Sequence, residues 1–196
     1  MLLNCHSYYS LRYGVLSPEE LIVQAKANNY DCIALTDINC MTGVYDFVRT
    51  AIKHGIKAVV GIEFRNGDEL LYLAIAKNTQ GFKELNEHLS SHNYSKKNFP
   101  KVAPAFLHAF VIYPLSNLPK QLKDNEYLGI QSEEINRVFR EKELLKKAVI
   151  LHPVTISSRF NHGLHQCLRA IDHNIVLDKL HKQQQETWFL KYNSCM

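Results

Sequence analysis

The sequence has no apolar run long enough to cross a membrane and no segment laid out as a signal peptide. A membrane-spanning helix needs about 20 predominantly apolar residues. Residues 1–6 lack the basic start and the small-residue cleavage site of a secreted protein. The five cysteines are odd in number and include no Cys-x-x-Cys pair, which indicates free thiols in a reducing compartment. These absences predict a cytoplasmic protein with no membrane partner.

Strong charge of one sign is also missing, since the formal net charge is only +4. The one dense basic stretch is KKNFPK, in which Lys96, Lys97 and Lys101 surround Phe99. Lysines neutralise phosphates and an aromatic ring can stack on a base, so a nucleic-acid contact is one interpretation. A solvated basic loop is the other, because a single loop is a small footprint for nucleic acid. The contact predicts salt-sensitive DNA binding that is lost when Lys96 and Lys97 are neutralised.

What the sequence does contain is a regular alternation of strand and helix signals over its first 64 residues. Apolar segments at 1–5, 32–36 and 57–64 predict strands. The sequence SPEE at 17–20 forms a capping box that starts one helix. A second helix has apolar residues at helical spacing from Val44 and ends at Gly55. This order predicts parallel βαβ units.

The second half of the chain continues the alternation less regularly. Further strand signals lie at 69–76, 109–114, 126–131 and 147–153, and a helix starts at Thr79. The polar residues 90–104 predict a loop. We therefore expect one α/β domain over residues 1–181, built as a closed or partly closed barrel.

Two features near the C-terminal end carry separate expectations. Leu164, Cys167, Leu168 and Ile171 lie at helical spacing and predict a last helix. Residues 182–196 have weak periodicity and include the lone Trp188. A domain rarely offers such a segment to water, so it either folds back as an edge strand or packs against something missing. We interpret it as an extension toward a missing part of a longer chain.

Polar side chains follow several of the predicted strands. Ligands of parallel α/β proteins lie just past the carboxyl ends of the strands, and there the sequence has His6, Asp37, Glu63 and His152. Imidazole and carboxylate groups are the usual ligands of catalytic divalent metals. The sequence therefore raises the hypothesis of a metal site at one edge of the sheet.

The segments around these positions resemble a known family. The stretches NCHSYYSLRYG (4–14), ALTDINCMTGVYDF (34–47), GIKAVVGIEF (55–64) and LAIAKNTQGFKEL (73–85) are similar, in order, to the N-terminal PHP (polymerase and histidinol phosphatase) domain of bacterial DNA polymerase III alpha subunits. Shorter likenesses, LHQCLRAIDHN and FLKYNSCM, extend the resemblance over nearly the whole chain. The resemblance implies a distorted seven-stranded βα barrel and leaves open a truncation at its C-terminal end.

The chain departs from the family pattern at the metal ligands. Metal-binding members have His-x-His where this chain has NCH at 4–6, Thr-Asp-His where it has TDI at 36–38, and Asp-x-His where it has PVT at 153–155. Of the usual ligand types only His6, Asp37 and Glu63 plainly remain, and Asn4 is a weak neutral substitute. These residues are too few to offset the charge of two or three metal ions.

The resemblance therefore implies a structural and subunit-docking domain of a DNA polymerase, with a vestigial metal site at Asn4, His6, Asp37 and Glu63 and no catalytic residue of its own. Its partners would be the remainder of the polymerase chain, the proofreading exonuclease subunit and, through the parent chain, DNA. The parent polymerase would use magnesium, and this chain is expected to hold no cofactor, or at most one weakly held zinc or manganese ion. The alternative is a metal-dependent phosphoesterase, either free-standing or proofreading in cis.

Overall fold

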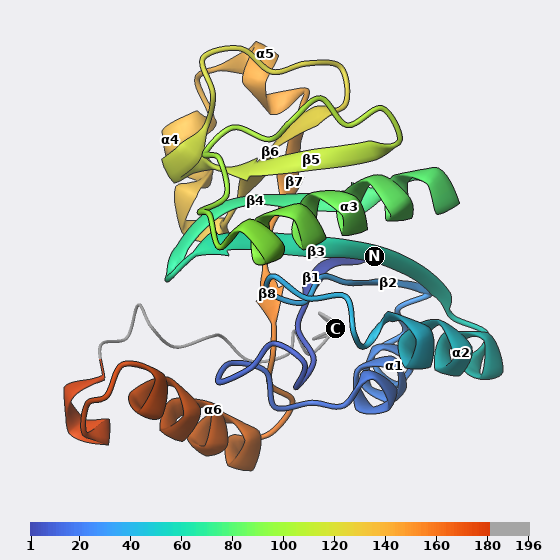
Figure 1. The fold of residues 1–196 in the computed structure, drawn as a ribbon, viewed down its shortest axis with the longest axis vertical. Helices are drawn as coiled ribbons and strands as arrows, with labels where there is room; N and C mark the ends of the chain where they lie inside the picture. The colour runs from blue at the N-terminus through green and yellow to red at the C-terminus, as the bar shows by residue number, and fades with distance from the viewer. Residues whose placement is uncertain (181–196) are drawn as a thin grey trace, which may run out of the picture.

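The computed structural model describes residues 1–180 and shows an α/β fold built on one curled sheet (Figure 1). The predicted extension at 182–196 lies outside the described residues. Eight strands are hydrogen-bonded in the order β7-β6-β5-β4-β3-β2-β1-β8. Within residues 1–180, no helix combines the length and the apolar character that a bilayer crossing requires.

The strands occupy the segments that the sequence predicts. Their bounds are Leu2–Cys5 (β1), Cys32–Leu35 (β2), Lys57–Asn66 (β3), Glu69–Ala76 (β4), Ala109–Pro114 (β5), Glu126–Ile130 (β6), Ala148–Ile150 (β7) and Pro153–Val154 (β8). The α-helices are Pro18–Ala27 (α1), Val44–His54 (α2), Thr79–Ser95 (α3), Ile135–Val138 (α4), Lys142–Leu145 (α5) and Arg159–Asp172 (α6). Short 3₁₀ turns cover Leu115–Asn117, Ser132–Glu134 and Leu177–Lys179.

The two edges of the sheet meet at one broken strand. β7 and β8 stand at opposite ends of the strand order, yet only two residues separate Ile150 from Pro153. Such a connection spans at most about 11 Å, so the sheet must curl until its edges lie together. β7 and β8 follow one another in the same direction in Figure 1. They are two halves of the seventh strand expected at 147–153, which confirms the distorted seven-stranded barrel.

Most neighbouring strands are parallel, as the βαβ rhythm predicts. β4 is the exception, because it pairs antiparallel with both β3 and β5. The β3–β4 connection is a tight hairpin in which Asn66 pairs with Glu69 and Gly67 takes a φ of +59°. A glycine adopts that left-handed conformation without strain. The hairpin joins the carboxyl end of β3 directly to β4 and so fixes the position of the end of β3.

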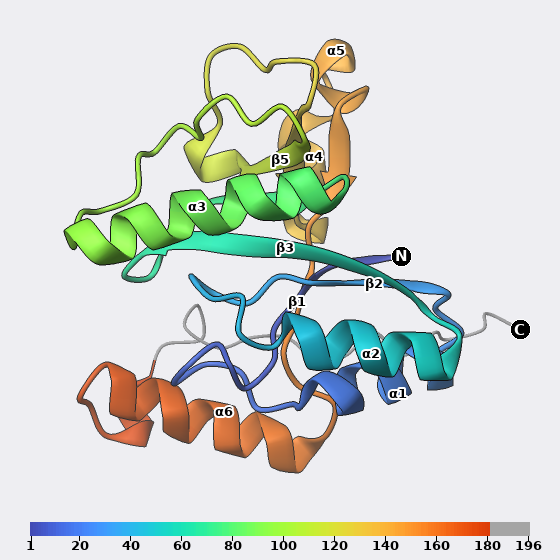
Figure 2. The ribbon, with the colours of Figure 1, turned by 45° about the vertical axis from the view of Figure 1, so that its right-hand side comes forward.

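Helices α1, α2 and α3 cover the outside of the barrel. Ser17 and Glu20 form the expected capping box at the start of α1, and α2 ends at Gly55 in the left-handed conformation. α1 and α2 lie side by side against β1–β3, and α3 crosses the outer face of β3 and β4 (Figures 1 and 2). The hydrophobic core between α1, α2 and the sheet includes the fully buried Leu21 and Phe47.

One expectation at a helix is wrong. α3 continues to Ser95, although a loop was expected from residue 90, because His92 stacks on Phe99 with ring centroids 4.8 Å apart and gives the last turn a packing partner. The predicted last helix is present as α6, but its apolar residues Leu164 and Ile171 are 42% and 65% exposed. The buried side chains of α6 include His165 and Arg169 instead.

Candidate site at the barrel mouth

The carboxyl ends of the parallel strands bring the predicted site residues together. Asn4 lies in β1 and His6 follows it, Asp37 follows β2, and Glu63 lies in β3. All four side chains are at most 2% exposed. Parallel strands deliver their ends to the same edge of a sheet, which explains why residues 59 positions apart touch.

Glu63 is at the centre of the cluster and is fully buried. Its Oε2 accepts hydrogen bonds from Asn4 Nδ2 at 2.8 Å and from His6 Nε2 at 3.1 Å. Its Oε1 accepts from the Nε of Arg65, two residues along the same strand. Burial by itself would raise the pKa of Glu63, but the charge of Arg65 and the contacts with His6 and Asn4 outweigh it and lower the pKa to about 2. Glu63 is therefore a carboxylate held by protein donors on both oxygens.

Asn4 and His6 connect this carboxylate to the neighbouring strands. Asn4 Oδ1 accepts a hydrogen bond of 2.8 Å from the Thr36 hydroxyl. His6 Nδ1 hydrogen-bonds with Thr155 Oγ1 at 3.0 Å. The asparagine thus uses both ends of its amide and the histidine uses both ring nitrogens, so neither is left open toward a ligand.

Asp37 is held in a separate set of contacts with the loop between β1 and α1. Its Oδ1 accepts from the Ser7 backbone N–H and the Ser10 hydroxyl, and its Oδ2 accepts from the Ser7 hydroxyl, each at 2.7 Å. Burial raises the pKa of Asp37, and the hydrogen bonds from Ser10 and Ser7 oppose that rise. Asp37 therefore anchors this loop to the end of β2.

Arg65 is the residue of this cluster that reasoning from the sequence missed. Its Nη2 donates to the Tyr13 hydroxyl at 3.1 Å, and its guanidinium carbon lies 4.7 Å from the centre of the Tyr13 ring. Arg169 of α6 lies 5.0 Å from the same ring centre. A signal was present, because residues 63 and 65 of a strand point to the same face. Arg65 therefore had to accompany Glu63 into the barrel.

The residues present do not fit a divalent ion. Both oxygens of Glu63 and of Asp37 are bound by protein donors, and a guanidinium lies where a metal would have to neutralise Glu63. A second cation beside Arg65 would meet like-charge repulsion in a poorly solvated site. Within residues 1–180, no group of three or more His, Cys, Asp or Glu side chains is arranged to hold a metal. His152, the fourth residue predicted at the strand ends, lies half-buried at the break between β7 and β8.

The basic stretch at 96–101 forms a different environment from the one the nucleic-acid interpretation assumed. Phe99 is only 7% exposed and packs in a core cluster, so its ring is not available to stack on a base. Lys101 Nζ donates to Glu69 at 2.8 Å. Lys96 and Lys97 are exposed, and the contact through them stays a prediction.

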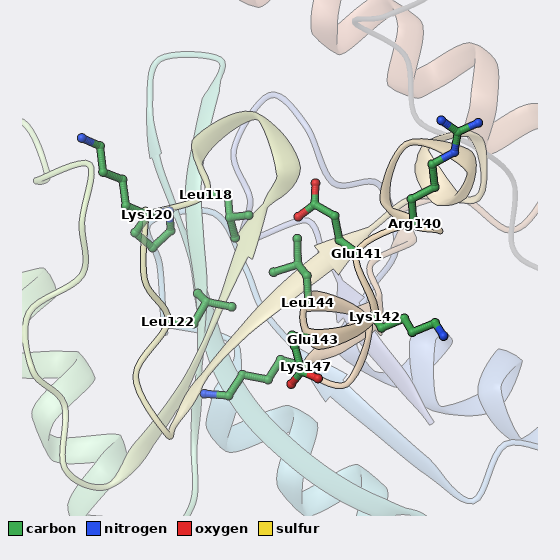
Figure 3. Close-up of a pocket in the computed structure, with 10 residues that line it drawn as sticks. Leu118, Lys120, Leu122, Arg140, Glu141, Lys142, Glu143, Leu144 and Lys147 are labelled. Atoms are coloured by element: carbon green, nitrogen blue, oxygen red, sulfur yellow. The ribbon is translucent and has the colours of Figure 1, made fainter.

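One cavity adjoins the Glu63 cluster and another lies away from it. One of about 440 Å³ opens above the Glu63 cluster and is lined by residues that include Tyr13, Arg65 and Arg169. A larger one of about 600 Å³ lies away from the barrel mouth, between the loop after β5 and α5 (Figure 3). In Figure 3 the side chains of Leu118 and Leu144 point into it. None of the predicted site residues lines that larger cavity.

His165 links α6 to the mouth and should make the stability of the protein depend on pH. Its Nδ1–H donates to the Tyr13 carbonyl at 2.7 Å and the side chain is fully buried. Burial is the largest cause that lowers the pKa of His165 from 6.5 to about 4. Between these two pH values the folded state therefore binds fewer protons than the unfolded state. The contribution of neutral His165 to the stability of the fold is present above pH 6.5 and is lost as the pH falls toward 4.

We expect the thermal unfolding temperature of the protein to decrease as the pH is lowered from 7 to 4.5. The unfolding temperature of the variant His165→Asn should decrease less steeply over the same range. Asparagine keeps a donor near the Nδ1 position but does not titrate. Unfolding scans of both proteins across this range provide the measurement. An identical slope for the two would contradict this role of His165.

Comparisons with known proteins agree with the sequence resemblance. The family model described as PHP domain matches residues 3–137. The DNA polymerase III subunit alpha of Ureaplasma parvum is 39% identical over 83 residues, which is 42% of this chain and 8% of that protein. The subunit of the same name from Staphylococcus aureus strain Mu50 is 28% identical over 190 residues, which is 93% of this chain and 18% of that protein. The chain thus spans less than a fifth of the length of these curated relatives.

One solved structure illustrates the structural matches. A two-domain protein from Bacteroides vulgatus, containing a predicted PHP-like metal-dependent phosphoesterase, aligns over 89% of this chain and 49% of its own. The sequence identity is 14% and the TM-score is 0.39. A match at this level supports no argument about function.

Proposed function

The chain belongs to the PHP domain family, and from this membership we propose that it is the N-terminal PHP domain of a replicative DNA polymerase III alpha subunit. In this proposal its metal site is degenerate, and it braces the polymerase and docks other subunits. The network in which Arg65 neutralises the buried Glu63 is the observation that carries the proposal. A domain with an internal cation at this position needs no metal to keep its strand ends together.

The similarity to polymerase subunits supports the placement within a larger chain. The Staphylococcus aureus relative matches 93% of this chain but only 18% of its own length. The remainder of such a protein would carry the polymerase activity and its magnesium ions. We propose that the partners of this chain are that remainder, the proofreading exonuclease subunit and, through the parent polymerase, DNA.

Metal content is the measurement that tests the degenerate site. We expect the purified chain to retain far less than one ion per chain, by elemental mass spectrometry, after dialysis against zinc and manganese followed by desalting. The physical reason is that both carboxylate oxygens of Glu63 and of Asp37 already accept hydrogen bonds from the protein. Arg65 in addition supplies the charge that compensates Glu63. About one ion or more per chain would overturn the proposal.

The variant Arg65→Gln is the matched comparison for this measurement. It removes the positive charge beside Glu63 but keeps a hydrogen-bond donor. If its metal content rises while that of the unmodified chain stays near zero, the guanidinium excludes the ion. If neither protein takes up metal, the missing ligands at positions 4 and 38 are sufficient to abolish the site.

The second candidate function is a metal-dependent phosphoesterase, which the clustering of His6, Asp37 and Glu63 at the barrel mouth favours. It requires at least one bound zinc or manganese ion to activate water. Hydrolysis of a phosphodiester substrate that chelators abolish, and that Glu63→Gln also abolishes, would establish this function in place of the structural one.

A further inference from the structure

A cavity opens at the end of the barrel opposite to the Glu63 cluster. Its volume is about 380 Å³, and its lining comes from β1 and from β3 to β7. Leu3, Val59, Ile75 and Ile112 of this lining also belong to the hydrophobic cluster inside the barrel. The barrel therefore leaves part of its apolar core open where its parallel strands begin. A concave, mostly apolar opening with a few polar groups is a candidate ligand site.

The length of β3 places this cavity and the barrel mouth at opposite ends of the barrel. Lys57, Val59, Gly61 and Glu63 fall on one face of the strand because strand side chains alternate. Six residues of strand cover about 20 Å, so Lys57 and Glu63 stand at opposite ends of the barrel interior. The cavity at Lys57 is therefore a site distinct from the one at Glu63.

Two lysines supply the charge at this opening. Lys57 begins β3 and Lys77 follows β4, and both line the cavity. The Nζ of Lys77 lies 4.6 Å from the centre of the Phe110 ring and donates to the Leu107 carbonyl at 3.4 Å. No acidic side chain is among the lining residues, and neither lysine forms an ion pair with any part of the chain that the structure describes. The opening thus carries two lysine charges that have no salt-bridge partner among the described residues.

We propose that this cavity binds a medium-chain carboxylate, with its hydrocarbon chain among the apolar side chains of the barrel and its carboxylate between Lys57 and Lys77. The volume lies within the range of small-ligand pockets. A hydrocarbon chain suits the site better than a peptide end, because the lining side chains other than the lysines and Tyr127 are apolar. The amide groups of a peptide would lose their hydrogen bonds to water without gaining others. This inference does not depend on the polymerase assignment.

Methyl NMR on the 196-residue chain provides the test, because the cavity wall is made of isoleucine, leucine and valine. Octanoate is titrated below its micelle concentration into protein labelled at these methyl groups. We expect saturable shifts at Val59, Ile75 and Ile112. Affinity should rise about fourfold for each methylene from hexanoate to octanoate, as the burial of each CH₂ predicts.

Matched ligands and variants distinguish the contribution of the carboxylate charge to binding from that of the hydrocarbon chain. Octanol and octylamine have the same chain without the negative charge and should bind at least several-fold more weakly than octanoate. The double variant Lys57→Gln/Lys77→Gln should reduce octanoate affinity by about threefold to thirtyfold, the range for two partly exposed ion pairs. The control Lys53→Gln/Lys83→Gln changes two exposed lysines outside the cavity and should leave the affinity unchanged.

The outcomes decide the proposal in either direction. Saturable octanoate shifts that weaken in the Lys57/Lys77 variant but not in the control would support it. Equal binding of octanol and octanoate, no saturation at millimolar octanoate, or an unaffected double variant would overturn it. Shifts from an acetylated dipeptide ending in leucine, without shifts from octanoate, would also overturn it and would identify the opening as a protein-docking site.

Discussion

Replacing Arg65 with methionine is expected to destabilise the protein by about 3–5 kcal/mol at neutral pH, the cost of leaving one partner of a buried ion pair uncompensated. Glu63 is fully buried and Arg65 is its cationic partner. Methionine keeps much of the arginine stem and its packing on Tyr13, so the loss reports the charge rather than a cavity. Urea unfolding at pH 7 measures it.

The pH dependence of this effect follows from the pKa of Glu63. In the unmodified protein that pKa lies near 2, below its ordinary 4.5, so the contribution of Glu63 is present above pH 4.5 and is lost as the pH falls toward 2. Without Arg65, burial dominates and raises the pKa of Glu63. The destabilisation of Arg65→Met should therefore shrink as the pH is lowered from 7 to 5.

Two further variants make the Arg65 prediction specific. Arg65→Met/Glu63→Gln removes both charges and should recover much of the lost stability, because no uncompensated ion remains buried. Arg49→Met removes an exposed arginine that pairs with Asp46 at 3.0 Å, and exposed pairs contribute at most about 1 kcal/mol. A loss for Arg65→Met no larger than that for Arg49→Met would refute the role of Arg65 as the internal cation.

Replacing Asp37 with alanine is expected to cost a similar amount, about 3–5 kcal/mol, because it strands several buried donors at once. The Ser7 backbone N–H cannot turn away, and the Ser7 and Ser10 hydroxyls lose their acceptor. Each buried donor left without a partner costs about 1–3 kcal/mol. Urea unfolding gives the magnitude, and chymotrypsin cleavage near Tyr8 and Leu11 should become faster because the loop after β1 loses its anchor.

Asp37→Asn is the matched variant for this prediction. It keeps the shape and one acceptor oxygen, and burial already raises the pKa of Asp37 toward its neutral form, so its loss should be smaller than that of Asp37→Ala. Asp46→Ala changes an exposed carboxylate and serves as the control. Equal stability and equal protease resistance of Asp37→Ala and Asp46→Ala would disprove the anchoring role.

The sequence predicted the order and type of the elements well because their signals are local. The SPEE capping box and the apolar strands depend on neighbours a few residues away. The end of α3 was missed for the opposite reason. His92 is polar and predicts solvent, but Phe99 returns to stack on it. A contact across an irregular turn leaves no periodic signal in the chain.

The predicted site residues were also found together, since parallel strands deliver their ends to one edge. The side chains that surround these residues could not be predicted in the same way. Arg65 was not recognised as the partner of Glu63, although the two-residue spacing allowed it. Tyr13, whose ring lies beside both Arg65 and Arg169, is over 150 residues from Arg169 in sequence, and the two meet only through packing.

By itself, then, the sequence determined an α/β barrel of the PHP family and placed His6, Asp37 and Glu63 at its mouth, because strand order and pleat bring them there, while Asn4 came from the family resemblance. The tertiary structure alone decided that Arg65 neutralises Glu63, that α6 turns His165 and Arg169 inward, and that the opposite end of the barrel is open beside Lys57 and Lys77. The physical reason is that periodicity depends on backbone geometry along one segment. Charge pairing and cavities depend on side chains that distant segments bring into contact.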